Sequence, residues 1–140
     1  MRPAGAEAWP TGLGEIVMGS EQRFSPSYSL SDDGDFLRVQ WTPGVTIEAD
    51  DMRSKIAAVI AMSPQGRRPL LVDIGPLERI SPEAKELVIQ ERYSTRTAVV
   101  GADDVGRVIT AFHYRAATPS RYFTQESDAI EWLLEDVVPR

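Results

Sequence analysis

Residues 67–90 read RRPLLVDIGPLERISPEAKELVIQ and contain half of a βαβ unit. The apolar run at residues 70–74 is too short for a helix, so it predicts a strand that is buried on both faces. A Gly-Pro pair ends this strand. Ser81 then offers the side-chain oxygen of a helix N-cap, Pro82 suits the first helical position, and Glu83 suits the positive end of the helix dipole.

The segment before this unit predicts a hairpin followed by a helix. Residues 25–30 and 36–41 read as two strands, and the Asp-Gly pair between them is an ordinary hairpin signal. The spacing of the loop aspartates does not match a calcium-binding loop. From residue 46 the pattern becomes helical and places Lys55 off the buried face. The residues predicted to line that face are Met52, Ile56, Val59 and Ile60.

Two more strand–helix pairs follow the central unit. A strand at residues 97–100 precedes a helix that Asp103 caps, and a strand at 121–123 precedes a helix with Thr124 as its N-cap. The third helix is expected to bury Val105, Val108, Ile109 and Phe112, and the closing helix Ala129, Ile130, Leu133, Leu134 and Val137. This order predicts an α/β fold, with a mainly parallel sheet, an N-terminal antiparallel hairpin and four helices.

The chain divides into an arm and one domain. Residues 1–20 contain scattered apolar side chains but sustain no period, so residues 1–24 are interpreted as an N-terminal arm. Residues 25–140 contain no linker, repeat or low-complexity segment. They are long enough to bury a core of their own and are expected to form a single domain.

Composition excludes several function classes. The 140 residues include no cysteine and one histidine, His113, which excludes disulfides and leaves no plausible zinc site. The net charge of −6 argues against general nucleic-acid binding. No apolar run has the length of a membrane span and the N-terminus lacks the plan of a signal peptide, so we expect a cytoplasmic protein.

No catalytic constellation can be assembled from these residues. His113 has no Ser-His-Asp or Cys-His spacing around it, and Gly101 and Gly106 form neither phosphate-binding motif. We therefore expect no enzymatic activity, no cofactor and no metal.

Two short motifs, together with the order of the elements, point to a known family. Residues 71–74 (LVDI) precede the helix at Ser81, and residues 120–124 (SRYFT) precede a helix with Ala-x-x-Trp-Leu at 129–133. Over about residues 25–138 the chain resembles the STAS domain of sulfate transporters and anti-sigma-factor antagonists. It is most similar to the stand-alone SpoIIAA-like proteins.

The resemblance implies a non-enzymatic regulatory or protein-interaction module. In the antagonists, a partner kinase phosphorylates a serine at the start of the second helix, in a pattern like Asp-Ser-Ser-Gly. The matching place here reads SPEA, residues 81–84. With Asp73 aligned to the aspartate that closes the central strand, Glu83 stands at the phospho-acceptor position and Ser81 two positions earlier. The switch does not carry over residue for residue, and capping alone explains Ser81.

Distant relatives of the family bind apolar ligands, which gives an alternative function. A small apolar ligand or lipid would occupy a pocket under the sheet, lined by Met52, Phe112 and Trp132 and open to solvent. A solid core with an exposed apolar patch would instead favour protein interaction.

The charge pattern also predicts the kind of partner. Each helix begins with carboxylates, among them Glu83, Asp103 and Asp104, and the helix starts gather at one edge of a parallel sheet. This acidic rim is expected to repel nucleotides and to favour a basic protein surface. We further expect a homodimer, because the arm is apolar and Tyr114 must point away from the core if Phe112 faces it.

Overall fold

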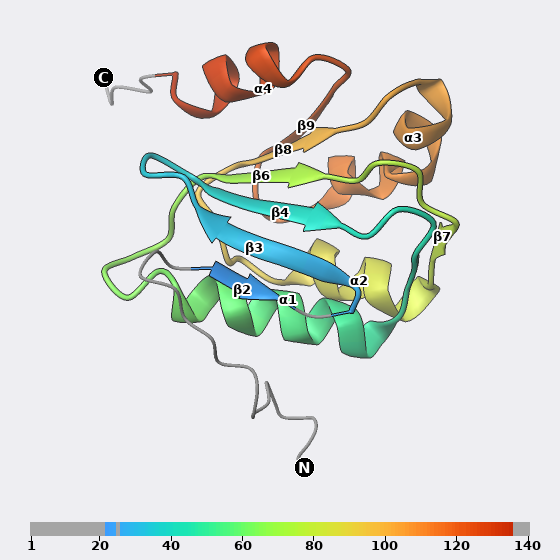
Figure 1. Ribbon diagram of the computed structural model, residues 1–140, viewed down its shortest axis with the longest axis horizontal. Helices are drawn as coiled ribbons and strands as arrows, with labels where there is room; N and C mark the ends of the chain where they lie inside the picture. The colour runs from blue at the N-terminus through green and yellow to red at the C-terminus, as the bar shows by residue number, and fades with distance from the viewer. Residues whose placement is uncertain (1–21, 25, 136–140) are drawn as a thin grey trace.

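The computed structural model describes residues 22–24 and 26–135 of the chain (Figure 1). Most of the arm predicted at residues 1–24, together with Val137, lies outside the described residues. The six-stranded sheet has the order β2-β3-β4-β6-β8-β9. Its strands are β2 (Gln22–Phe24), β3 (Tyr28–Asp32), β4 (Leu37–Trp41), β6 (Leu70–Asp73), β8 (Thr97–Val100) and β9 (Ser120–Phe123).

The sheet is antiparallel at one side and parallel over the rest. β2 pairs with β3 and β3 with β4 in antiparallel register, whereas β4, β6, β8 and β9 are parallel neighbours. The helices are α1 (Ala49–Ala61), α2 (Pro82–Gln90), α3 (Asp104–Ile109), the 3-10 helix η1 (Ala111–Arg115) and α4 (Glu126–Leu133). The predicted α/β class, the N-terminal hairpin and the four helices are thereby confirmed.

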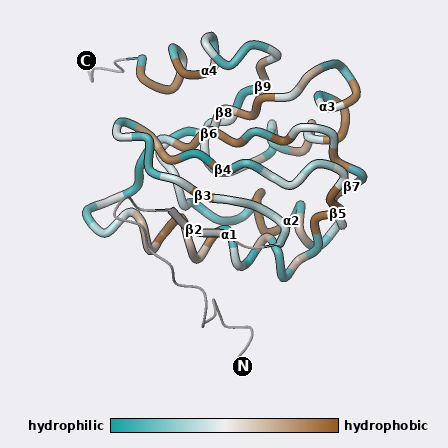
Figure 2. The backbone as a smooth tube through the Cα atoms, in the orientation of Figure 1, coloured by the Kyte–Doolittle hydropathy of each residue, from teal (hydrophilic) through white to brown (hydrophobic). Residues whose placement is uncertain are grey.

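The two faces of the sheet have separate cores. Figure 1 shows α1 and α2 on one face and α4 on the other. Alternate residues of β4 (Leu37, Val39 and Trp41) pack toward α1 and α2. Toward α4, the buried residues are Phe36, Leu71, Ala98, Val100, Ala129 and Leu133. Strands β6 and β8 contribute to both cores, which explains their nearly continuous hydrophobicity in Figure 2.

A second, two-stranded sheet was not predicted. β5 (Thr46–Ile47) pairs in parallel with β7 (Arg79–Ile80), so the loops after β4 and β6 are bonded to each other. The N–H of Glu78 donates to the carbonyl of Val45 and the N–H of Ser81 to that of Ile47, each at 2.9 Å. This ladder ties together the segments that lead into α1 and α2.

Arg68 fixes the loop before β6 to the β3–β4 hairpin. Its guanidinium donates two hydrogen bonds to Asp32, at 2.9 and 2.8 Å, and a third to the carbonyl of Gly34. The Arg68 hydrogen bonds hold the pKa of Asp32 at about 2, below its ordinary value. One of the loop aspartates is therefore a structural partner of arginine.

The predicted buried face of α1 is wrong at two positions. Ile60 is 54% exposed, whereas Lys55 is only 2% exposed. Lys55 follows Met52 by three positions and precedes Val59 by four, so helical geometry places it on the buried stripe despite its charge. Ile60 lies at the border of that stripe and points outward.

The third helix is shorter than predicted and does not bury the predicted stripe. Val105 and Val108 are exposed, and Gly106 is the buried residue of α3. The helix tightens into η1 after Thr110, whose side chain donates to the carbonyl of Gly106 at 2.7 Å. Phe112 therefore packs against the core from η1 rather than from α3.

The closing helix also differs at both ends. Its N-cap is Gln125, which makes no side-chain cap hydrogen bond, so the prediction of Thr124 is wrong. Gln125 keeps an extended backbone, which delays the helix by one residue. Leu134 is the C-cap and lies exposed beyond the last helical turn.

Candidate functional site

The carboxyl ends of the parallel strands meet at one edge of the sheet, where the five predicted site residues lie. Asp73 ends β6, is half-buried, and accepts a 3.2 Å hydrogen bond from the N–H of Gly75. Glu83, Asp103 and Asp104 are exposed, whereas Ser81 is buried. The acidic residues form part of the surface of this edge, and Ser81 lies beneath it.

Ser81 occupies a closed position. Its hydroxyl accepts from the N–H of Ala84 at 3.1 Å, which confirms the predicted helix cap. The side chain is 2% exposed, and the β5–β7 ladder engages its backbone. A kinase would have to open this helix start to reach the hydroxyl, so the position favours a structural role.

Asp103 and Tyr122 close the same edge at α3. The Asp103 carboxylate accepts from the N–H groups of Val105 and Gly106 at 3.0 and 3.2 Å, as predicted for a cap. The Tyr122 hydroxyl donates to the backbone carbonyl of Asp103 at 2.7 Å. A Cβ atom at Gly101 or Gly106 would collide with that hydroxyl, so both glycines admit the tyrosine.

The segment from α3 to η1 presents three large apolar side chains to solvent. Val105, Val108 and Tyr114 are 64%, 73% and 63% exposed. Val105 and Val108 are three residues apart and share one face of α3. Asp103 and Asp104 are exposed beside them in the chain. We call these five residues the α3–η1 face.

A buried polar cluster, which was not predicted from the sequence, lies between α1, α2 and η1. The Lys55 ammonium donates to the Tyr93 hydroxyl at 2.6 Å and lies 4.2 Å from the centroid of the Tyr93 ring. Burial lowers the pKa of Lys55 from 10.5 to about 7. In the part of the chain that the structure describes, no carboxylate forms an ion pair with this lysine.

The same buried environment shifts the pKa values of Tyr93 and His113. Burial, and secondarily the charge of Glu91, raises the pKa of Tyr93 well above its ordinary value. Burial, with the nearby positive charge of Lys55, lowers the pKa of His113 to about 3. The imidazole is therefore neutral near pH 7.

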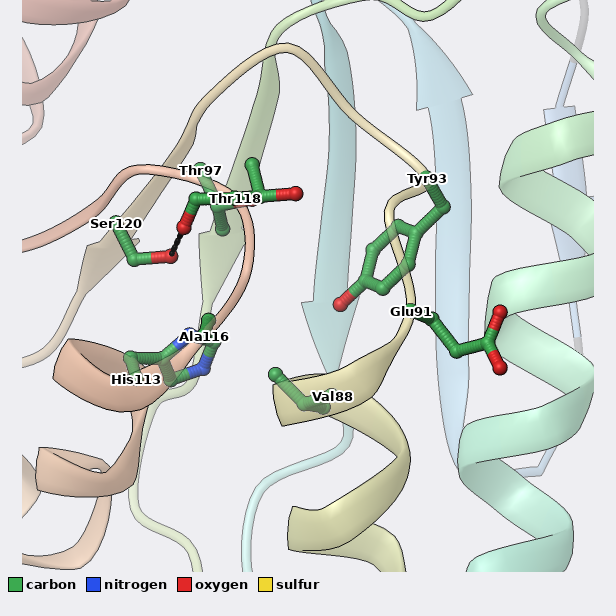
Figure 3. Close-up of a pocket in the computed structure, with 8 residues that line it drawn as sticks. All are labelled: Val88, Glu91, Tyr93, Thr97, His113, Ala116, Thr118 and Ser120. Atoms are coloured by element: carbon green, nitrogen blue, oxygen red, sulfur yellow. Dashed lines mark hydrogen bonds between the residues drawn. The ribbon is translucent and has the colours of Figure 1, made fainter.

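A narrow crevice adjoins this cluster (Figure 3). Its walls come from the end of α2, the following loop, η1 and the start of β9. The lining residues are Val88, Glu91, Tyr93, Thr97, His113, Ala116, Thr118 and Ser120. Two buried side-chain atoms among them, His113 Nδ1 and Thr118 Oγ1, have no hydrogen-bond partner among the residues that the structure describes. In this conformation the crevice is too narrow for a water molecule.

The apolar pocket predicted from the sequence is not assembled. Met52 is enclosed in the core beneath α1, whereas Trp132 packs against Phe123 on the opposite face of the sheet. Phe112 is half-buried over the α1–α2 side. The three proposed lining residues thus do not surround one cavity.

The structure also bears on metals and membranes. Within residues 22–24 and 26–135, no group of three or more His, Asp or Glu side chains is placed to hold a metal ion. None of the helices described for this chain has both the length and the hydrophobicity needed to cross a bilayer.

The fold is SpoIIAA-like, as the resemblance implied. It is similar to the crystal structure of an uncharacterised protein with a SpoIIAA-like fold from Shewanella loihica PV-4, of the DUF3478 family. The TM-score is 0.54 and the identity 16%, over 76% of this chain and 92% of that one. The chain itself belongs to the family described as "Domain of unknown function (DUF7793)", whose family model matches residues 28–136.

A second solved structure covers the same share of this chain. It is a protein with unknown function from Arthrobacter sp. FB24, 28% identical over 76% of this chain and 98% of that one, with a TM-score of 0.31. Among curated proteins there is no significant match.

Proposed function

We propose that this domain is a non-enzymatic interaction module that binds a basic partner protein through the α3–η1 face. The observation that carries the proposal is the exposure of Val105, Val108 and Tyr114 within ten residues of the chain. Isolated exposed apolar residues are ordinary, but three on consecutive short elements favour a contact surface.

Charge supports a basic partner. Asp103 and Asp104 are exposed at the start of α3, and Glu83 is exposed at the start of α2 on the same edge of the sheet. The chain as a whole carries a net charge of −6. A basic surface would gain from these carboxylates, and added salt should weaken the contact.

The other functions expected from the fold have less support. The enclosed hydroxyl of Ser81 argues against a phosphorylation switch at that residue. The separation of Met52 from Trp132 argues against an apolar pocket of the expected lining. We therefore rank protein binding above lipid or apolar-ligand binding.

The test is a quantitative affinity purification from the host with a disrupted face. Val105→Lys together with Val108→Lys removes the apolar contacts and repels a basic surface, so it should abolish the enrichment of a basic protein that wild type retains. Ile60→Lys is the matched control, because Ile60 is an exposed apolar residue on α1. Equal enrichment by all three proteins, each verified to be folded, would contradict the proposal.

The predicted homodimer can be examined on the same samples. Light scattering at micromolar concentration should give twice the monomer mass for wild type if this face pairs with a second copy. The Val105→Lys, Val108→Lys protein should then be monomeric, and the Ile60→Lys control should remain dimeric. A monomer mass for wild type would remove the dimer from the proposal and leave the basic partner.

A further inference from the structure

Two buried polar atoms face one crevice and lack partners. Thr118 is almost completely buried, and its Oγ1 makes no hydrogen bond to any described part of the chain. His113 Nδ1 is also enclosed, and it too has no partner there. Native proteins rarely leave buried polar atoms unsatisfied, because each costs the free energy of its lost hydration. Water does not satisfy them here, because the crevice does not admit it.

The groups that face this space are suited to donate hydrogen bonds. Figure 3 shows the hydroxyls of Thr118 and Tyr93 directed into the space between them. The Tyr93 oxygen accepts from Lys55, and within the described residues its own hydrogen has no acceptor. His113 supplies a third donor in the tautomer that is protonated at Nδ1. A ligand that only accepts hydrogen bonds would satisfy all three.

The electrostatic environment favours a negative charge. The Lys55 ammonium contacts the Tyr93 hydroxyl, and its charge is not balanced by an ion pair in the described part of the chain. Glu91 is the one acidic residue in the lining, and Figure 3 shows its carboxylate on the side of Tyr93 away from the hydroxyl. An anion in the crevice would be a counterion for the buried ammonium.

The walls limit the size and charge of that anion. Val88 and Ala116 supply apolar surface, and the three donors are too few to solvate a phosphate dianion. A carboxylate needs fewer partners and can carry an apolar substituent against those walls. The chemistry of the lining therefore fits a small organic monocarboxylate.

One wall, the 3-10 helix η1, is short and partly exposed. None of the five residues of η1 is fully buried. The segment after η1 is held to α2 by the hydrogen bond from the N–H of Ala117 to the carbonyl of Ile89, at 3.0 Å. Outward displacement of this short 3-10 segment would widen the crevice without disturbing the sheet.

We propose that the crevice between α2 and η1 is a binding site for a small organic monocarboxylate, held by the hydroxyls of Thr118 and Tyr93 and by His113 and paired with Lys55. Binding would require movement of η1 to widen the crevice. The crevice differs from the α3–η1 face proposed for a protein partner, although η1 contributes to both, with His113 in the crevice and Tyr114 in the face.

The test is an NMR titration of the full chain with acetate, propionate and benzoate at constant ionic strength. At least one should shift the amide signals of residues 113–118 saturably, with a Kd below about 10 mM. The matched amides, acetamide, propionamide and benzamide, carry no charge and should produce no saturable shift. Inorganic phosphate should also fail.

Thr118→Val removes the unpaired hydroxyl at nearly constant volume. It should weaken carboxylate binding about tenfold while leaving the free domain at least as stable as wild type. Thr124→Val, at an exposed threonine on the strand-to-helix turn before α4, is the control and should bind as wild type.

Three results would overturn the proposal. They are the absence of saturable shifts with all three carboxylates, equal binding of carboxylates and amides, and unchanged affinity in Thr118→Val. Any one of these results would mean that the unpaired atoms do not form a carboxylate-binding site.

Discussion

The carboxyl edge of the sheet and the α2–η1 crevice both contain buried polar groups, yet they treat them in opposite ways. At the edge, Ser81 and Asp103 each satisfy backbone N–H groups, and Tyr122 donates to a carbonyl. In the crevice, Thr118 Oγ1 and His113 Nδ1 have no hydrogen-bond partner within residues 22–24 and 26–135. The polar groups named at the edge are hydrogen-bonded, whereas these two buried atoms of the crevice are not.

This difference means that the unused hydrogen-bonding capacity lies away from the edge where the site residues were predicted. Open α/β proteins usually bind ligands at the carboxyl edge, and that expectation motivated the predicted site residues. Here the β5–β7 ladder and the Tyr122 side chain fill the edge. Polar groups with unused hydrogen-bonding capacity lie instead under α2, next to a lysine with a lowered pKa. The contrast can be tested by perturbing each region separately.

The largest effect is expected from Lys55 and depends on pH. In the folded state Lys55 loses its proton near pH 7, whereas in the unfolded chain it keeps it to about pH 10.5. Between these values the unfolded state binds more protons, so the free energy of unfolding rises with pH. Wild type should gain roughly 3 kcal/mol relative to Lys55→Met between pH 7 and pH 9.5.

Urea denaturation at several pH values measures this difference. The measurement should stay below about pH 10, because the tyrosines of the unfolded chain ionise around that pH. Lys85→Met, on α2, is the control, because Lys85 is only half-buried. A Lys55→Met curve parallel to that of wild type would mean that Lys55 is solvated and that no polar cluster is buried there.

An intermediate effect is expected at the closed edge. Gly106→Ala places a Cβ 2.6 Å from the Tyr122 hydroxyl and should destabilise the domain by about 2 kcal/mol, although alanine is the better helix former. Tyr122→Phe removes the colliding oxygen, so the same alanine should cost much less in that background. Thermal unfolding of the four proteins gives the coupling energy, and additive effects would contradict the packing described.

The smallest effect is expected from the helix cap. Ser81→Ala leaves the N–H of Ala84 without its partner and should lower the free energy of unfolding by about 1 kcal/mol. Ser127→Ala, at an exposed position in α4, should change it by less than about 0.5 kcal/mol. Equal values for the two variants would show that Ser81 is not the structural cap described here.

The sequence was sufficient for the fold and for the helix caps at Ser81 and Asp103, but not for the β5–β7 ladder that closes the edge. Residues 67–90 contain a buried strand, a stop signal and a capped helix, all of which are local patterns. Asp103 was recognised as a cap for the same reason. The prediction of the buried stripe of α3 was wrong because Gly106 is the residue that faces inward. The Tyr122 side chain, which leaves no room for a larger residue at Gly106, lies sixteen positions later in the chain.

The crevice depends on residues that only the tertiary structure brings together. Tyr93 and His113 come from a loop and a 3-10 helix, and no spacing rule relates them to Lys55. One signal was available, because Lys55 shares the helical stripe of Met52, Ile56 and Val59. The charge of Lys55 predicts a surface position, whereas the helical periodicity alone predicts a buried one.

The β5–β7 ladder has a consequence for how this family can vary and be engineered. Since Thr46–Ile47 and Arg79–Ile80 are paired, the loops after β4 and β6 are not independent in length. An insertion in one loop would break its register with the other, so tolerated length changes should occur in matched pairs. Peptides grafted at this end of the molecule would need to replace both loops together.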